Sequence, residues 1–320
     1  MILYEGLIAA GFTPMDKRAN LRLDMIPAIV EHLRRYGLKG IYVCGSTGEG
    51  PSLSSQERKK VAQAYAQAAG GRIPIIVQVG HDSLAEAKDL AQHAWSIGAD
   101  AISMVAPHYY KMDSVDTLVD CLAEIGSAVP CTPLFYYHIP ALSGIAFSMR
   151  EFLDAACERV PNFAGIKYSA VAIHDYQDCL DYARGRCQIL FGCDEMLLSA
   201  LSVGARAAIG STYNFAAPLY YRIIETFKRG DHGTACQLQG HSVALCRLLH
   251  EYRGMPAIKT MMQFIGLDCG PTRLPLRALT NEETARLCRE VERLGFFDWI
   301  SAKKPTAIGQ VQKELAETKH

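Results

Sequence analysis

The strongest constraint on the fold is a regular alternation of short apolar runs with longer amphipathic stretches over two-thirds of the chain. Most of the short runs are continuously apolar, which is expected of parallel strands that are covered by helices. The amphipathic stretches between them have the length and periodicity of helices. The eight predicted strands span residues 6–10, 40–44, 73–79, 101–106, 132–138, 164–168, 188–192 and 207–210.

The segments between the strands carry residues that are typical of helix starts and helix ends. Ser54 is followed three residues later by Glu57, as in a capping box, and another helical segment ends at Gly37. Eight consecutive βα units predict an α/β protein with a TIM (β/α)8 barrel. The alternative is an open doubly wound sheet, but residues 10–14 lack the glycine-rich fingerprint that such a sheet carries after its first strand.

The pattern becomes wholly helical beyond about residue 216. A barrel of ordinary size is complete by that point. We therefore expect a barrel domain over residues 1–216, which carries the active site, and a C-terminal helical extension over residues 217–320. The tail after residue 300 is expected to be loosely held.

Charge and cysteine content narrow the class of protein. Lysine plus arginine and aspartate plus glutamate balance at 33 each, so a nucleic-acid partner is not expected. No apolar run is long enough to cross a membrane, and the first residues lack the pattern of a signal peptide. The 11 cysteines are scattered and never spaced as CxxC, which favours reduced thiols in a cytoplasmic protein. No cluster has the spacing of metal ligands, and no metal is expected.

A lysine in a strand is the first candidate for chemistry. Lys167 stands in the predicted strand 164–168 among small and aromatic residues. A buried, unpaired ammonium loses its proton readily, and a neutral lysine can form a Schiff base with a ketone. Taken alone, a lysine whose head reaches solvent at the end of a strand is the simpler interpretation.

Other polar residues fall where the strands of a barrel end, which is where active sites of such barrels lie. The turn Gly45-Ser46-Thr47-Gly48-Glu49 follows the second strand and can hold a carboxylate, although a helix cap explains it equally well. Strand alternation requires that one of Tyr136 and Tyr137 faces inward. Further polar groups follow the seventh and eighth strands at Gly192, Asp194, Glu195 and Ser211. Together these residues fit a Schiff-base aldolase.

Three motifs in the right order give a specific resemblance. The turn 45–49, the run Tyr137-His138-Ile139-Pro140-Ala141-Leu142-Ser143-Gly144 and Gly165-Ile166-Lys167 resemble the dihydrodipicolinate synthase/N-acetylneuraminate lyase family. The resemblance covers the whole barrel. Within the family, the chain resembles the branch that cleaves sialic acid in the runs 139–144, 191–195 and 210–214. Leu142 counts against the synthase branch, which usually carries an arginine there for a second carboxylate. His138 also departs from the family, which often has asparagine there; alternation points it away from Tyr137.

The resemblance implies a role for each matching residue. Lys167 would form the imine, and Tyr137 would transfer the proton as the carbon–carbon bond breaks. Ser46 would hold the substrate carboxylate with Thr47 and relay protons to Tyr137, and Tyr110 would enter a neighbouring subunit's site. The residues that would bind the remainder of the substrate are Ser169, Gly192, Asp194, Glu195 and Ser211.

The implied activity is reversible cleavage of N-acetylneuraminate to N-acetylmannosamine and pyruvate by a cofactor-free homotetramer. Another 2-keto-3-deoxy sugar acid is the first alternative substrate. Dihydrodipicolinate synthesis and non-catalytic binding of a sugar acid are the remaining alternatives.

Overall fold

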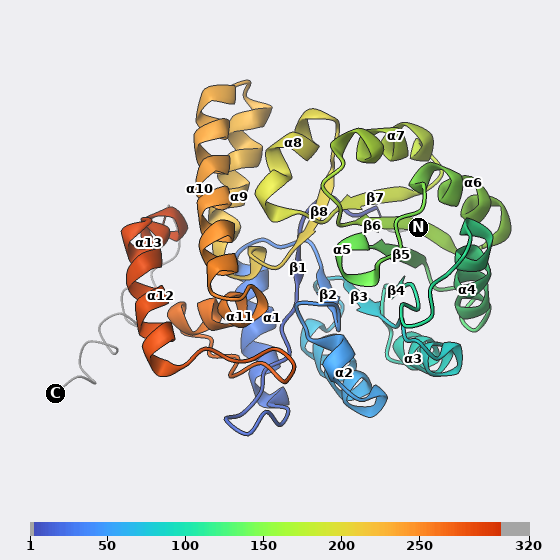
Figure 1. Ribbon diagram of the computed structural model, residues 1–320, viewed down its shortest axis with the longest axis horizontal. Helices are drawn as coiled ribbons and strands as arrows, with labels where there is room; N and C mark the ends of the chain where they lie inside the picture. Colours follow the sequence, from blue (N-terminus) through green and yellow to red (C-terminus); the bar gives the residue numbers. More distant parts are fainter. Residues whose placement is uncertain (1–2, 302–320) are drawn as a thin grey trace.

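The computed structural model describes residues 3–301 and contains a closed barrel of eight parallel strands in chain order (Figure 1). Strand β1 pairs with both β2 and β8, which closes the barrel. This confirms the predicted barrel and excludes the open doubly wound sheet. The strands are β1 (Gly6–Ala10), β2 (Ile41–Val43), β3 (Ile75–Gln78), β4 (Ala101–Val105), β5 (Leu134–His138), β6 (Phe163–Tyr168), β7 (Gln188–Phe191) and β8 (Ala207–Gly210).

Helices follow each strand and surround the barrel. Ser54 and Glu57 form the expected capping box at the start of α2. The helices up to the last strand are α1 (Ile26–Arg35), α2 (Ser55–Ala69), α3 (Leu84–Ser96), α4 (Val115–Ser127), α5 (Pro140–Ser143), α6 (Met149–Arg159), α7 (Ile173–Ala183) and α8 (Leu197–Ser202). Short 3-10 turns precede three of the helices, at Leu23–Met25, Gly50–Ser52 and Asp194–Met196.

Strand alternation sorts the side chains into two cores. Tyr136 and Tyr168 point outward into the layer between strands and helices, where the ring of Tyr136 packs 4.7 Å from that of Phe152. Tyr137 and Tyr42 point into the barrel. The outward direction expected of His138 is confirmed, since its ring lies 5.1 Å from that of Tyr168.

The C-terminal helices gather on one side of the barrel (Figure 1). They are α9 (Tyr213–Lys228), α10 (His232–Glu251), α11 (Met255–Phe264), α12 (Asn281–Arg293) and α13 (Phe296–Ile300). The expected boundary at residue 216 falls inside α9, where Ala216 has non-helical backbone angles. Helix α11 was not predicted from the sequence. The tail after residue 300 was predicted to be loosely held. From residue 302 onward this tail lies outside the described part of the chain.

No helix within residues 3–301 combines the length and the apolar character that a membrane span requires.

Two glycine substitutions test the barrel. Gly165 on β6 has φ of +141°, and an added methyl group would collide with the carbonyl oxygen of Gln188 on β7. Gly165→Ala should therefore destabilise the protein by about 3 kcal/mol or more, measured by denaturant unfolding. Gly240 in α10 is exposed and has open space around it. The control Gly240→Ala should instead stabilise the protein by about 0.5–1 kcal/mol; equal effects of the two variants would contradict the structure.

Candidate active site

Lys167 lies inside the barrel and not at its solvent edge. The residue is 4% exposed, and its Nζ lies 3.9 Å from the ring centroids of both Tyr42 and Tyr137. Burial lowers the pKa of Lys167 to about 7, and the negative charge of Asp194 opposes this shift only in part. A substantial fraction of the amine is therefore neutral near pH 7, as a nucleophile requires.

Tyr137 on β5 is the residue paired in register with Lys167 on β6. Its hydroxyl lies 3.4 Å from the Ser46 hydroxyl. Burial raises the pKa of Tyr137 to about 12, while the nearby hydroxyls of Ser46 and Ser169 counteract the shift. Ser169 Oγ is buried beside the Tyr137 hydroxyl and has no other hydrogen-bond partner within the described residues.

The turn after β2 presents its hydroxyl groups toward the same end of the barrel. The turn is closed by the amide of Glu49, which donates to the Ser46 carbonyl at 3.0 Å. Thr47 Oγ1 and Ser211 Oγ lie 2.6 Å apart, which joins the turn to the end of β8. Ser46, Thr47 and Ser211 therefore form one polar cluster with Tyr137.

The loop after β7 contributes a buried carboxylate. Asp194 Oδ2 accepts hydrogen bonds from Thr212 N at 2.8 Å and from Thr212 Oγ1 at 2.6 Å. Burial raises the pKa of Asp194 to about 6 despite these bonds. Gly192 lies against Ser169, and a methyl group at Gly192 would collide with the Ser169 hydroxyl. Glu195 is half-buried beside Asp194.

Tyr110 lies at the surface in the loop after β4. It is 85% exposed and packs edge-on against Tyr109, which is also exposed. Leu142, on α5, is exposed as well. This exposed aromatic pair lies beyond the end of β4, and the amide of Tyr109 donates to Asp82 Oδ1 at 3.3 Å.

Sequence reasoning missed two residues that shape the site. Tyr42 flanks the lysine, and its hydroxyl donates to Ser103 at 3.0 Å. Its inward direction could have been derived from alternation along the predicted strand 40–44. Thr212 orients Asp194 through two hydrogen bonds. No local sequence pattern predicts this pairing, because the two residues meet only when β7 and β8 lie side by side.

No group of three or more histidine, cysteine, aspartate or glutamate side chains that could hold a metal ion occurs in residues 3–301.

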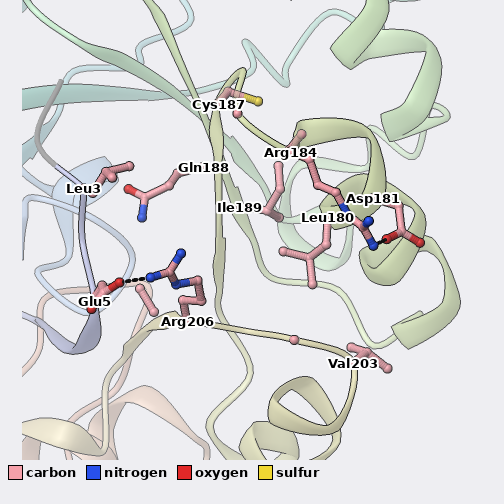
Figure 2. Close-up of a pocket in the computed structure, with 14 residues that line it drawn as sticks. Leu3, Glu5, Leu180, Asp181, Arg184, Cys187, Gln188, Ile189, Val203 and Arg206 are labelled. Carbon is pink, nitrogen blue, oxygen red and sulfur yellow. Dashed lines mark hydrogen bonds and ion pairs between the residues drawn. The ribbon is translucent and has the colours of Figure 1, made fainter.

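A separate hollow of about 670 Å³ lies at the opposite end of the barrel (Figure 2). Its lining includes Gln188 at the start of β7 and the ion pair between Glu5 and Arg206, which precede β1 and β8. None of the predicted site residues lines it. It is therefore not the site that the strand ends form.

A lysine of lowered pKa, buried next to a tyrosine at the mouth of a (β/α)8 barrel, is the arrangement of a class I, Schiff-base aldolase. The model of the dihydrodipicolinate synthetase family matches residues 3–294. The chain belongs to this family, which confirms the resemblance seen in its motifs.

Relatives within the family point to one branch. The chain is 36% identical over 304 residues to N-acetylneuraminate lyase of Rattus norvegicus, covering 93% of this chain and 95% of that protein. The solved N-acetylneuraminate lyase (sialic acid aldolase) of Aliivibrio salmonicida is 38% identical, with a TM-score of 0.90, and the match covers 92% and 98% of the two chains. A structure described as the catalytic lysine mutant of Ruminococcus gnavus sialic acid aldolase is 28% identical, with a TM-score of 0.86 and 92% and 96% covered.

The pKa of Lys167 can be measured directly. In protein labelled with ¹³C at lysine Cε, one signal should titrate near pH 7, because the buried amine is neutral above this pH and charged below it. Lys167→Met should remove that signal. Asp194→Asn should move its midpoint to lower pH, because the carboxylate that favours the ammonium is gone. A midpoint at the model-peptide value of about 10.4 would contradict the burial described here.

Proposed function

We propose that this protein is a Schiff-base aldolase that reversibly cleaves N-acetylneuraminate to N-acetylmannosamine and pyruvate. The observation that supports this most is the position of Lys167 Nζ, 3.9 Å from the ring of Tyr137 and buried with it in the barrel. The names of the relatives agree with this proposal.

Lys167 supplies the electron sink. Its neutral amine attacks the C2 ketone of the open-chain sugar acid, and loss of water gives a protonated imine. The C3–C4 bond then breaks, and its electrons flow into the imine to form an enamine. Protonation at C3 and hydrolysis release pyruvate and restore the amine.

Tyr137 handles the proton of the C4 hydroxyl. With its pKa raised to about 12 by burial, the phenol holds its proton in the free protein. The cationic imine that forms beside the ring favours the phenolate, so the tyrosine becomes a base only after the substrate is bound. The hydroxyl of Ser46 at 3.4 Å provides a relay for that proton.

Different residues of the site bind the two halves of the substrate. Ser46 and Thr47 hold the carboxylate next to the ketone. The groups that meet the remaining hydroxyls and the N-acetylmannosamine portion are Ser169, Gly192, Asp194, Glu195 and Ser211. Leu142 offers no charge to a second carboxylate, which argues against dihydrodipicolinate synthesis.

The activity test compares substrates and variants. The protein should release pyruvate from N-acetylneuraminate, and borohydride with pyruvate should add a stable pyruvyl mass at Lys167. Lys167→Met should abolish both results. Tyr137→Phe should lower kcat by about 10²- to 10⁴-fold, because the proton acceptor is lost.

Tyr136→Phe is the matched control, because its buried hydroxyl faces the helices and has no partner within the described residues. It should leave kcat unchanged. Turnover of 2-keto-3-deoxygluconate alone would identify the alternative substrate class. Ligand binding with no pyruvate release would identify a non-catalytic protein.

We further propose that the protein acts as a cytoplasmic homotetramer in which Tyr110 reaches a neighbouring subunit's site. Tyr110 is 85% exposed and Tyr109 is 76% exposed, which supports an interface in which another subunit covers this pair. The buried thiols Cys44, Cys179 and Cys269 are free, as suits a reducing compartment.

Light scattering should give about four times the chain mass of 35.2 kDa. Tyr110→Phe should lower kcat with no change in that mass, whereas Tyr109→Phe should not alter kcat. A monomeric, fully active protein would refute this arrangement.

A further inference from the structure

A buried ion pair joins the C-terminal helices to the mouth of the barrel. Lys259 on α11 places its Nζ 2.7 Å from Glu49 Oε1, across a separation of 210 residues. The two side chains are 1% and 0% exposed. Such a pair is costly to desolvate and gives little net stability compared with apolar packing, so its place in the structure needs another explanation.

Glu49 is the last residue of the turn that carries Ser46 and Thr47. It is a non-glycine residue with φ of 55°, a strained conformation that the surroundings must hold. Its amide donates to the Ser46 carbonyl, so the backbone of Glu49 closes the turn. Fixing the side chain of Glu49 therefore fixes the backbone that presents Ser46.

Both carboxylate oxygens of Glu49 are held by the C-terminal extension. Oε1 accepts from Lys259, and Oε2 accepts from the backbone amide of Arg273 at 2.8 Å. Lys259 also donates to the carbonyl of Pro271 at 2.8 Å. On the barrel side, Thr13 Oγ1 donates to the carbonyl of Gly48 at 2.7 Å. The turn is thus clamped between the barrel and the segment 259–273.

We propose that Glu49 and Lys259 are positioning residues that hold the hydroxyls of Ser46 and Thr47 in the geometry that binds the carboxylate of the 2-keto acid. This inference rests on the proposed function, because the carboxylate is that of the pyruvate half of the substrate. Neither residue contacts the substrate; both act through the turn. The C-terminal extension is accordingly part of the apparatus that binds pyruvate.

Glu49→Gln is the sharpest test, because it keeps the shape and removes one acceptor. An amide cannot accept from both Lys259 and Arg273, since one of its two ends is itself a donor. The pyruvate concentration that gives half-maximal borohydride trapping at Lys167 should rise on the order of tenfold, the loss expected for a hydrogen bond to a charged group. The maximal trapping rate should stay within about twofold, since Lys167 is untouched.

Glu49→Gln leaves the Lys259 ammonium buried without its carboxylate partner, and the double variant Glu49→Gln/Lys259→Met removes that ammonium. The half-saturating pyruvate concentration should rise in the double variant as much as in Glu49→Gln. Arg253→Met is the matched control. It breaks the ion pair between Arg253 and Glu283 within the same extension, 2.7 Å long, without touching the turn. Its half-saturating pyruvate concentration should equal that of the unmodified protein.

An unchanged half-saturating concentration in the folded Glu49 variants overturns the proposal, as does a fall in maximal rate alone. If neither variant folds, the pair serves the fold and the proposal is equally wrong. Failure of the unmodified protein to trap pyruvate would instead refute the proposed function and this inference together, so the two failures are distinguishable.

Discussion

Desolvation of one ammonium group is the constraint on which the site depends. The interior of the closed barrel surrounds Lys167 with two tyrosine rings, and this burial brings its pKa to about 7. The same burial has the opposite effect on Tyr137, whose pKa rises to about 12. One low-dielectric environment therefore supplies both a neutral amine and a protonated phenol, the starting state that imine formation needs.

Barrel closure makes these shifts possible and also collects the polar partners. Because all eight strands run parallel, their carboxyl ends meet at one mouth, and residues as distant as Thr47 and Ser211 come within 2.6 Å. Because side chains alternate along each strand, neighbouring residues face either the barrel interior or the surrounding helices. Tyr137 faces the lysine, while Tyr136 packs against Phe152 of α6 and His138 packs against Tyr168 outside the barrel interior.

Much of this could be predicted from the sequence, because strand periodicity and strand ends are local signals. The eight strands and the polar turn at Ser46 follow from such signals. The inward direction of Lys167 and the choice of Tyr137 over Tyr136 came instead from the resemblance to the family, because alternation alone leaves both open. Helix α11 was not predicted, although it is as long as α1 and, like α1, lacks a side-chain cap bond. The pairings of Asp194 with Thr212 and of Glu49 with Lys259 were missed because they depend on tertiary contacts that no local pattern encodes.

The span between Glu49 and Lys259 has a consequence for biosynthesis. A ribosome completes every strand of the barrel, and all the proposed catalytic residues, about 50 residues before it adds Lys259. During that interval the carboxylate of Glu49 lacks the cation that neutralises it in the finished protein. The turn therefore acquires its final hydrogen-bond partners only after residues 259–273 have been synthesised.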